Sequence, residues 1–259
     1  MEFTAVNRES NFSKSYTYKE FEYKTPLEIS EGSKLKHQVV IIGAGPIGLT
    51  LAIDLAQRGV KSVVLDDNNI VSTGSRAICW AKKTLEIFNR VGIADKIIDK
   101  GITWEVGRLF NGDDEVYSFN LLPEKGHKFP AFVNLQQYYV EEFLIEKCIE
   151  LSNFIDLRFS NEVISHVQRS NDIELSVRCP EGLYNIECQY LVACDGADSS
   201  TRKRMGLSFE GEIFDEHFLI VDIHMERPPF EGVSPERWFW FAPTFHEGQS
   251  ALLHKQADN

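Results

Sequence analysis

Apolar and polar positions along the chain first form a regular pattern at Gln38. The apolar, β-branched run over 38–42 predicts a buried strand, and apolar residues at helical spacing predict a helix over 46–58 that ends at Gly59. A second apolar run predicts a strand over 61–66. Strand, helix and strand in this order indicate a βαβ unit, whose two strands lie parallel in one sheet.

After this unit the pattern changes from mainly helical to mainly strand. Helices are predicted over 77–90, 135–151 and 200–205, and strands over 102–120 (a pair around a turn at 111–114), 155–168, 172–178, 184–193, 216–225, 236–241 and 249–254. The first 37 residues are polar and aromatic without clear periodicity, which predicts an extended arm anchored through Phe21 and Tyr23. The last third indicates a sheet layer separate from the βαβ unit.

A glycine motif joins the first predicted strand to the first predicted helix. Its G-x-G-x-x-G sequence is Gly43, Ala44, Gly45, Pro46, Ile47 and Gly48. Gly43 permits a tight turn, Gly45 lets the backbone approach a pyrophosphate, and Gly48 lets the helix pack close to the strand. Asp66 lies 18 residues after Gly48, where a carboxylate accepts the hydroxyls of a ribose. The complete succession predicts a dinucleotide-binding site rather than a glycine-rich turn.

Composition and charge argue against several classes of function. The net charge of -12 is unsuited to a nucleic-acid surface, which needs a basic stripe. The five cysteines form no CxxC pair and the seven histidines show no metal-ligand spacing, so we expect neither a disulfide framework nor a metal site. No secretory signal is visible, and no apolar run approaches the ~20 residues that span a bilayer. We therefore expect a soluble, cytoplasmic protein with reduced thiols.

A second candidate segment follows the strand predicted over 184–193. Asp195 and Gly196 stand at its carboxyl end, and Ser199 and Arg202 follow at the start of a short helix. Ligands of α/β sheets bind beyond the carboxyl ends of strands, so Asp195 is expected in the same crevice as the glycine motif. Taken alone, such a segment is more often a tight turn capped by aspartate, with its arginine in solvent.

Together, the two segments resemble the FAD-dependent aromatic hydroxylases related to para-hydroxybenzoate hydroxylase. In that family the glycine motif holds the ADP part of FAD. A later D-G-x-x-S-x-x-R pattern, matched here over 195–202, serves both FAD and the transient nicotinamide cofactor. The spacing over 39–206 resembles most the 3-(3-hydroxyphenyl)propionate hydroxylase-like branch of the family.

Two further positions are similar to the family's pattern. Arg76 resembles its flavin-contacting arginine, and Gln137 with Glu141 resembles its Q-x-x-x-E helix start, whose glutamine reaches the ribityl chain. Asp66, followed by Asp67, stands where the family usually has glutamate. Because the aspartate side chain is shorter, both carboxylates remain candidates for the ribose contact.

The resemblance implies an α/β fold. Its parts would be an FAD/NAD(P)-binding Rossmann-like core of the glutathione-reductase type and an interleaved β-rich substrate layer, with the whole truncated. The FAD-binding core would comprise 38–100 and 134–206, and the partial substrate layer 101–133 and 207–259, after a polar N-terminal arm over 1–37.

The resemblance also implies a monooxygenase activity. NADH or NADPH would reduce FAD, which would react with O₂ to a flavin hydroperoxide that hydroxylates a small phenolic compound. Since the cofactor carries this chemistry, no acid, base or nucleophile of the chain need enter the oxygen-transfer step, and the residues do not identify the group that activates the phenol. The resemblance determines neither the phenolic substrate, nor the choice between NADH and NADPH, nor the oligomeric state.

Two departures from the family leave alternatives open. The third family motif, G-D-A-A-H, does not occur, so we expect the N-terminal part of a longer hydroxylase, or a truncated copy, inactive alone; a non-catalytic FAD-binding fragment is one alternative. The run over 237–243 nearly matches the W-x-W-x-I-P motif of flavin-dependent halogenases, the second alternative. An ordinary strand is favoured, with Trp238 and Trp240 on one face and Phe239 and Phe241 on the other.

Overall fold

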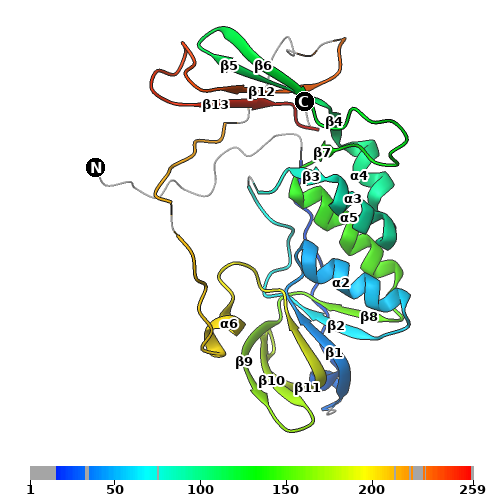
Figure 1. Cartoon of the computed structure of the whole chain (residues 1–259). Helices are drawn as coiled ribbons and strands as arrows, with labels where there is room; N and C mark the ends of the chain where they lie inside the picture. The colour runs from blue at the N-terminus through cyan, green and yellow to red at the C-terminus, as the bar shows by residue number, and fades with distance from the viewer. Residues whose placement is uncertain are drawn as a thin grey trace.

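The computed structural model describes residues 16–32, 35–74, 76–212, 214–221, 223, 230 and 232–257. They form an elongated molecule with a six-stranded sheet at one end and a four-stranded sheet at the other, and helices and a small three-stranded sheet lie between them (Figure 1). The helices are α1 Leu27–Ser30, α2 Pro46–Gln57, α3 Lys82–Val91, α4 Ala94–Lys100, α5 Gln137–Glu150 and α6 Ser200–Arg204.

The described strands outnumber the described helices, and they include β3 and β7, which were not predicted. They are β1 Lys36–Ile42, β2 Ser62–Leu65, β3 Cys79–Ala81, β4 Ile102–Trp104, β5 Val106–Asn111, β6 Asp114–Asn120, β7 Phe132–Asn134, β8 Ile155–Arg158, β9 Glu162–Gln168, β10 Ile173–Cys179, β11 Gly182–Ala193, β12 Glu236–Trp240 and β13 Ala251–His254.

The six-stranded sheet contains the predicted βαβ unit. Its strand order is β8-β2-β1-β11-β10-β9, and the pairs β8-β2, β2-β1 and β1-β11 are parallel. The last three strands form an antiparallel meander. Ile41 and Val64 pack with α2, α3 and α5 on one face, whereas Val40 and Leu65 pack with residues of β9, β10 and β11 on the other. Burial on both faces explains why residues 39–42 of β1 and 63–65 of β2 are all apolar.

The four-stranded sheet has the order β13-β12-β5-β6. Trp238 and Trp240 lie on the same face of β12, because side chains alternate along a strand, and Phe110 of β5 stacks on the Trp240 ring at 5.2 Å. On the other face, the Arg237 guanidinium lies 5.3 Å from the Phe239 ring and 5.5 Å from the Trp104 ring of β4. Packing against the neighbouring strand β5 thus accounts for the tryptophan pair.

The strand predicted over 155–168 is wrong as a single element. It divides into β8 and β9, which lie at opposite edges of the six-stranded sheet. Ser160 between them has φ 56°, in the left-handed region, which ends an extended chain. The buried Asn161 side chain donates to the Phe159 carbonyl at 2.7 Å and accepts from the Tyr184 hydroxyl at 2.7 Å, so this turn is held by long-range contacts.

Two other predicted elements differ from the structure. The helix predicted over 77–90 begins only at Lys82, because residues 79–81 pair with β7 and the Trp80 indole donates to the Leu135 carbonyl at 2.8 Å. The strand predicted over 216–225 does not form at its described residues, 216–221 and 223; the rest of that prediction lies outside the described residues.

The chain after α6 runs as an extended stretch toward β12 at the other end of the molecule (Figure 1). A strand requires a neighbouring strand for its backbone hydrogen bonds, and among the described residues none pairs with this stretch. Its apolar side chains are accordingly exposed, with Phe218 at 82% and Leu219 at 88%.

Candidate cofactor-binding site

The glycine motif forms a turn between the carboxyl end of β1 and the N-terminus of α2. The Gly43 N–H donates to the Leu65 carbonyl at 2.7 Å, and the Cys194 N–H donates to the Ile42 carbonyl at 2.8 Å. The ends of β2, β1 and β11 therefore meet around this turn. Pro46 occupies the first turn of α2, as predicted, where its missing N–H breaks no helical hydrogen bond.

The space around each glycine of the motif differs, and so does the reason why a side chain is absent there. Gly43 has φ 104°, and an added Cβ would lie 2.4 Å from the Cys194 carbonyl oxygen. A Cβ on Gly48 would lie 2.0 Å from the Gly43 carbonyl oxygen, so only glycine allows α2 to approach the turn this closely. Nothing lies within 4 Å of a Cβ added to Gly45. Gly43 and Gly48 are thus required by the fold itself, whereas Gly45 borders open space.

Asp66 binds the glycine turn from the neighbouring strand end. One of its carboxylate oxygens accepts from the Ala44 N–H at 2.6 Å, and the other accepts from the Asn68 N–H at 2.9 Å. Burial raises the pKa of Asp66 above its usual range, although these two hydrogen bonds oppose the shift. Asp67 is exposed and accepts from the side chain of Asn68. Of the two candidate acids, Asp66 is the one in contact with the glycine motif.

Arg76 lies at the end of the loop that follows Asp66, and Gln137 of α5 contacts the next residue, Ala77. The buried Glu141 of α5 accepts from the Ser72 N–H at 2.6 Å and from the Gln137 side chain at 2.7 Å. Gln137 in turn accepts from the Ala77 N–H at 3.4 Å. Arg76 is exposed and has no hydrogen-bonding or ionic partner among the residues that the structure describes.

Asp195 organises the second candidate segment. Its carboxylate accepts from the Ser199 hydroxyl at 2.6 Å and from the Thr201 N–H at 3.0 Å, while Ser199 caps α6 by accepting from the Arg202 N–H. Burial by itself would raise the pKa of Asp195, but the bonds from Ser199 and Thr201 hold it below its usual range. Gly196 follows with φ 80°.

The arginine of this segment is bound to its own turn. The Arg202 guanidinium donates to the Ala197 carbonyl at 2.8 Å and lies 5.2 Å from the Phe209 ring. The capped-turn interpretation therefore describes the local bonding here. The structure still places this segment directly after β11, beside the glycine turn, because the Cys194 carbonyl abuts Gly43.

A buried ion-pair network close to the site was not predicted. Arg158, at the end of β8, forms an ion pair with Glu28 of α1 at 2.9 Å, and His37 contacts the same carboxylate at 2.9 Å. Arg158 also pairs with Asp156 at 2.7 Å. No local sequence pattern connects residues 130 positions apart, so only the fold reveals this network.

The residues around the glycine turn fit the ADP part of FAD. The first turn of α2 presents unpaired N–H groups and the positive end of the helix dipole, which favour a pyrophosphate. The open space at Gly45 is where a phosphate can approach the backbone. Asp66 provides a carboxylate at the adjacent strand end. This combination defines a dinucleotide-binding domain.

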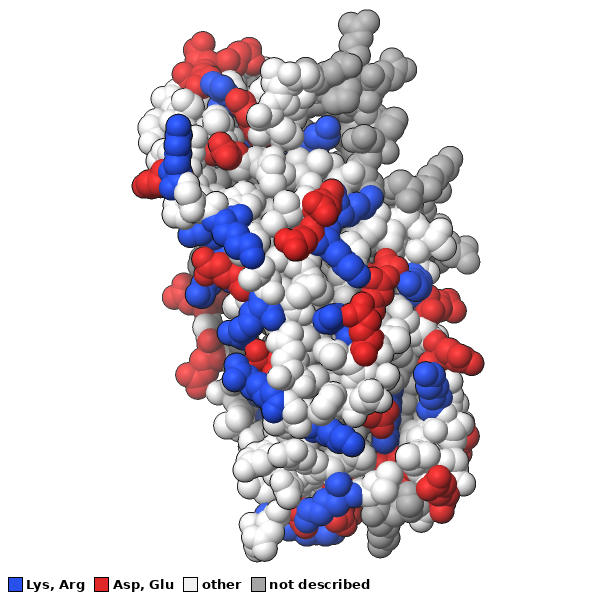
Figure 2. Space-filling view, turned by 90° about the vertical axis from the view of Figure 1, so that its right-hand side faces the viewer, with Lys and Arg blue, Asp and Glu red and all other residues white. Residues whose placement is uncertain are grey.

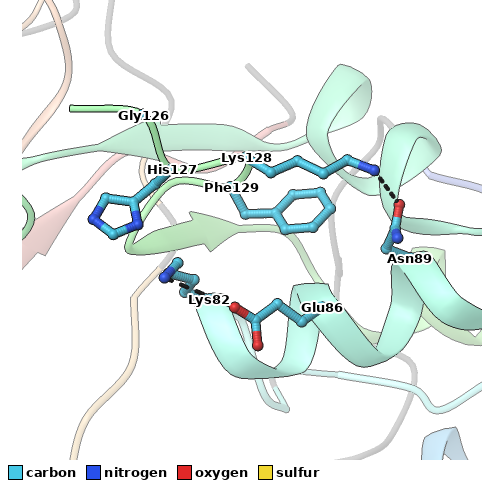
Figure 3. Close-up of a pocket in the computed structure, with 7 residues that line it drawn as sticks. All are labelled: Lys82, Glu86, Asn89, Gly126, His127, Lys128 and Phe129. Atoms are coloured by element: carbon cyan, nitrogen blue, oxygen red, sulfur yellow. Dashed lines mark hydrogen bonds and ion pairs between the residues drawn. The ribbon is translucent and has the colours of Figure 1, made fainter.

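A separate hollow lies away from the glycine turn. It measures about 330 Å³ between α3 and residues 126–129, and none of the predicted cofactor-binding residues lines it (Figure 3). Lys128 there donates to the Asn89 side chain at 2.7 Å, and Lys82 pairs with Glu86 at 3.7 Å. Both lysines are thus engaged with neighbouring side chains.

Surface charge, metal-ligand clusters and helix length bear on the other functional classes. On the face that carries the helices, Lys and Arg side chains alternate with Asp and Glu, without a basic stripe (Figure 2). Among the described residues, no group of three or more His, Cys, Asp or Glu could hold a metal ion. A search of the same residues finds no helix with the length and apolar character required to cross a membrane.

Comparison with known proteins identifies the family. A family model described as FAD binding domain matches residues 36–255. The chain therefore belongs to the FAD binding domain family, which confirms the predicted resemblance to FAD-dependent aromatic hydroxylases and the Rossmann-like α/β fold.

Individual relatives are monooxygenases by name. The chain is 32% identical to a flavin-dependent monooxygenase of Mycobacteroides abscessus, over 73% of this chain and 41% of the relative. It is 24% identical to the 3-(3-hydroxy-phenyl)propionate/3-hydroxycinnamic acid hydroxylase of Mycolicibacterium smegmatis, over 71% of this chain and 33% of the relative. The crystal structure of p-nitrophenol 4-monooxygenase PnpA from Pseudomonas putida DLL-E4 is similar with a TM-score of 0.65 and 26% identity, over 70% of this chain and 46% of that one.

These comparisons bear on the open alternatives. The relatives and the solved structure are named monooxygenases or hydroxylases, so the halogenase alternative is not favoured. The chain spans less than half the length of each of them.

Proposed function

We propose that this chain supplies the pyrophosphate and ribose side of the FAD site in a monooxygenase that hydroxylates a small phenolic compound with NADH or NADPH and O₂. The observation that carries the proposal is the glycine turn at the junction of β1 and α2, with open space at Gly45, in a chain of the FAD binding domain family. The predicted division into core (38–100 and 134–206) and substrate layer (101–133 and 207–259) is part of the proposal.

The pyrophosphate would lie against the first turn of α2. Its charge would interact with backbone N–H groups at positions 47 and 48, which are too near the helix start to have intrahelical partners. Gly45 keeps side-chain atoms away from this position. Asp66 would accept a ribose hydroxyl while its bond to the Ala44 N–H keeps the turn in place.

The other predicted residues would contact the rest of the cofactor. Arg76 has a permanent charge and a planar group suited to the pyrophosphate or the ribityl oxygens. Gln137 would turn toward the ribityl chain, with Glu141 holding its amide. Asp195 and Gly196 would face the cofactor from the end of β11, while Ser199 and Arg202 keep this segment in shape.

When bound, FAD would supply the redox chemistry that links the nicotinamide cofactor to O₂. The residues of this chain contribute position and charge. Hydroxylation of the substrate would be an activity of the whole protein, of which this chain would form the cofactor-binding part. We propose that the protein belongs to the 3-(3-hydroxyphenyl)propionate hydroxylase-like branch and that its substrate is a phenolic compound of the class which that branch hydroxylates.

A titration of FAD into the purified chain, followed by flavin fluorescence, tests the proposal. We expect saturable binding that Gly45→Trp abolishes, because the indole would fill the open space at the turn. Gly211→Trp is the matched control: a Cβ at Gly211 also meets nothing within 4 Å, but this residue lies after α6. Equal binding by the chain and by Gly45→Trp would contradict the proposed site.

A second candidate function is FAD binding without catalysis. It is favoured by the site itself, whose glycine turn and Asp66 would bind and position a cofactor without a group assigned to catalysis. NADH or NADPH oxidation by the FAD-loaded chain in air separates the two. Oxidation of the nicotinamide cofactor supports the monooxygenase, and FAD binding without that oxidation supports the second candidate for this chain.

The proposed compartment is the cytoplasm. All five cysteines are free thiols in the structure, three of them buried, which fits a reducing environment. Alkylation of the protein in intact cells, with mass spectrometry of Cys79 and Cys194, tests whether they are reduced there.

A further inference from the structure

Residues 16–25, which we call the N-terminal strap, lie along the loop between Asp66 and Arg76. The Phe21 N–H donates to the Asn69 carbonyl at 2.7 Å, and Glu20 and Ile70 form an isolated β-bridge. The strap therefore extends this loop by a short stretch of strand-like pairing.

The hydroxyl of Tyr18 makes a third contact with the loop. It accepts a hydrogen bond from the Gly74 N–H at 3.2 Å, two residues before Arg76. The contacts at Asn69, Ile70 and Gly74 thus span most of the loop. An exposed loop of this length would otherwise leave its backbone groups to water.

The strap is itself fixed to the rigid part of the molecule. The Tyr16 ring stacks on the Tyr138 ring of α5 at 4.1 Å, and the Phe21 ring stacks on the Phe159 ring at 4.9 Å. Lys19 pairs with Glu142 of α5 at 3.0 Å. These contacts fix the strap relative to α5 and to the end of β8.

The C-terminal end of the strap is anchored at a second place. The Thr25 hydroxyl donates to Glu181 at 2.7 Å, and the Tyr23 hydroxyl bonds to the same carboxylate. Glu181 lies in the turn between β10 and β11. Both ends of the strap are therefore bound to the scaffold, with the loop contacts between them.

The loop is held from its other side by α5. Glu141 accepts from the Ser72 N–H, and Gln137 accepts from the Ala77 N–H. The loop is consequently fixed between α5 and the strap. Asp66 and Arg76, at its two ends, are the residues that we assign to the ribose and to the pyrophosphate or ribityl oxygens.

We propose that the N-terminal strap is a positioning element for the FAD site, in which Tyr18 and Phe21 hold the loop over 67–74 in its cofactor-binding shape. The inference rests on the proposed function for its cofactor, but its structural part concerns this chain alone. The strap preorganises Asp66 and Arg76, so that FAD does not have to order the loop when it binds.

Two variants of the full chain test this role. Tyr18→Phe removes the hydroxyl that accepts from Gly74 and keeps the ring, and Phe21→Ala removes the stack on Phe159. Tyr117→Phe and Phe241→Ala are the matched controls, because both residues are exposed and lie in or beside the four-stranded sheet. The first measurement, made without cofactor, is amide hydrogen exchange of peptides covering 67–77.

We expect faster exchange of these peptides in both strap variants and in neither control. FAD should bind about fivefold more weakly to Tyr18→Phe, the effect of one lost hydrogen bond, and at least as weakly to Phe21→Ala. If Phe21→Ala does not fold, Tyr18→Phe alone decides. Unchanged exchange in the strap variants, or FAD affinities equal to those of the controls, would overturn the inference.

The failure of the proposed function gives a different result. If the unaltered chain binds no FAD, the assignment of the cofactor fails for this chain. Loop exchange still decides whether the strap holds the loop, because that measurement needs no cofactor.

Discussion

The carboxylate of Asp66 at the end of β2 accepts a hydrogen bond from the backbone N–H of Ala44 in the glycine turn, at 2.6 Å. This bond connects the two parts of the βαβ unit that the cofactor would touch. The acid thus has a role in the protein's own structure as well as its proposed contact with ribose.

The two neighbouring acids can be separated by mutation. We expect Asp66→Asn to weaken ADP and FAD binding by about tenfold, since a charged hydrogen bond is lost and the amide cannot accept from both N–H groups. Asp67→Asn should change the affinity by less than about twofold, because that side chain is exposed. Titration calorimetry with ADP measures both. The reverse order of effects would assign the ribose to Asp67.

Gly48 should be essential for folding as well as for binding. Gly48→Ala places a Cβ 2.0 Å from the Gly43 carbonyl oxygen, so α2 must move away from β1. We expect a loss of about 3 kcal/mol in the free energy of unfolding, measured with urea. Gly211→Ala, at an open position, should stay within about 0.5 kcal/mol of the unaltered protein. Equal stabilities would show that the helix has room here.

Arg76 should matter for the cofactor and hardly for stability. Arg76→Ala removes an exposed side chain with no partner among the described residues, so we expect a change below about 0.5 kcal/mol in unfolding. FAD affinity should fall about tenfold through the loss of one charge-assisted contact. Arg178→Ala on β10, whose side chain is 60% exposed, is the control for removing a surface arginine. Parallel losses in both variants would point to net charge instead.

The buried Glu28 makes the free energy of unfolding depend on pH in the acidic range. Burial alone would raise its pKa, but the bonds from His37 and the charge of Arg158 lower the pKa of Glu28 to about 2, from a usual 4.5. Its contribution is therefore present above about pH 4.5 and is lost as the pH falls toward 2. By linkage it amounts to the order of 3 kcal/mol.

Glu28→Gln tests this dependence. The variant should be about 3 kcal/mol less stable at pH 7, because Arg158 keeps only Asp156 as an ionic partner. Its stability should also fall less between pH 5 and pH 3 than that of the unaltered protein, in urea unfolding at each pH. The exposed Glu124→Gln is the control. A variant with the same acid dependence as the parent would place the titrating group elsewhere.

The glycine turn could be predicted from the sequence because its causes are local. A positive φ at Gly43 and a close approach at Gly48 leave glycine as the residue of choice, and the flanking apolar runs show which elements they join. Most of the strands followed from the same short-range pattern, whereas the short strands β3 and β7 did not. The family resemblance added Arg76 and Gln137, which no periodicity would have singled out.

The parts that could not be predicted depend on distant residues. The turn at Ser160 and Asn161 interrupts a run that alternates like one strand, and Tyr184 supplies the bond that holds it. In the strap, half-buried Tyr16, Tyr18, Phe21 and Tyr23 follow no clear periodicity, and the sequence pointed only to Phe21 and Tyr23 as anchors. Their partners lie about 50 to 160 positions away, and the sequence does not name them.

The position of β1 at the centre of the sheet has a consequence for synthesis on the ribosome. Val39 pairs with Tyr190, about 150 residues later in the chain. At the usual rate of translation, the apolar strand waits roughly 8 to 30 seconds for this partner. During that time one edge of the β-branched, uncharged run over 39–42 is open, so a chaperone that shields nascent chains is expected to raise the yield of native protein.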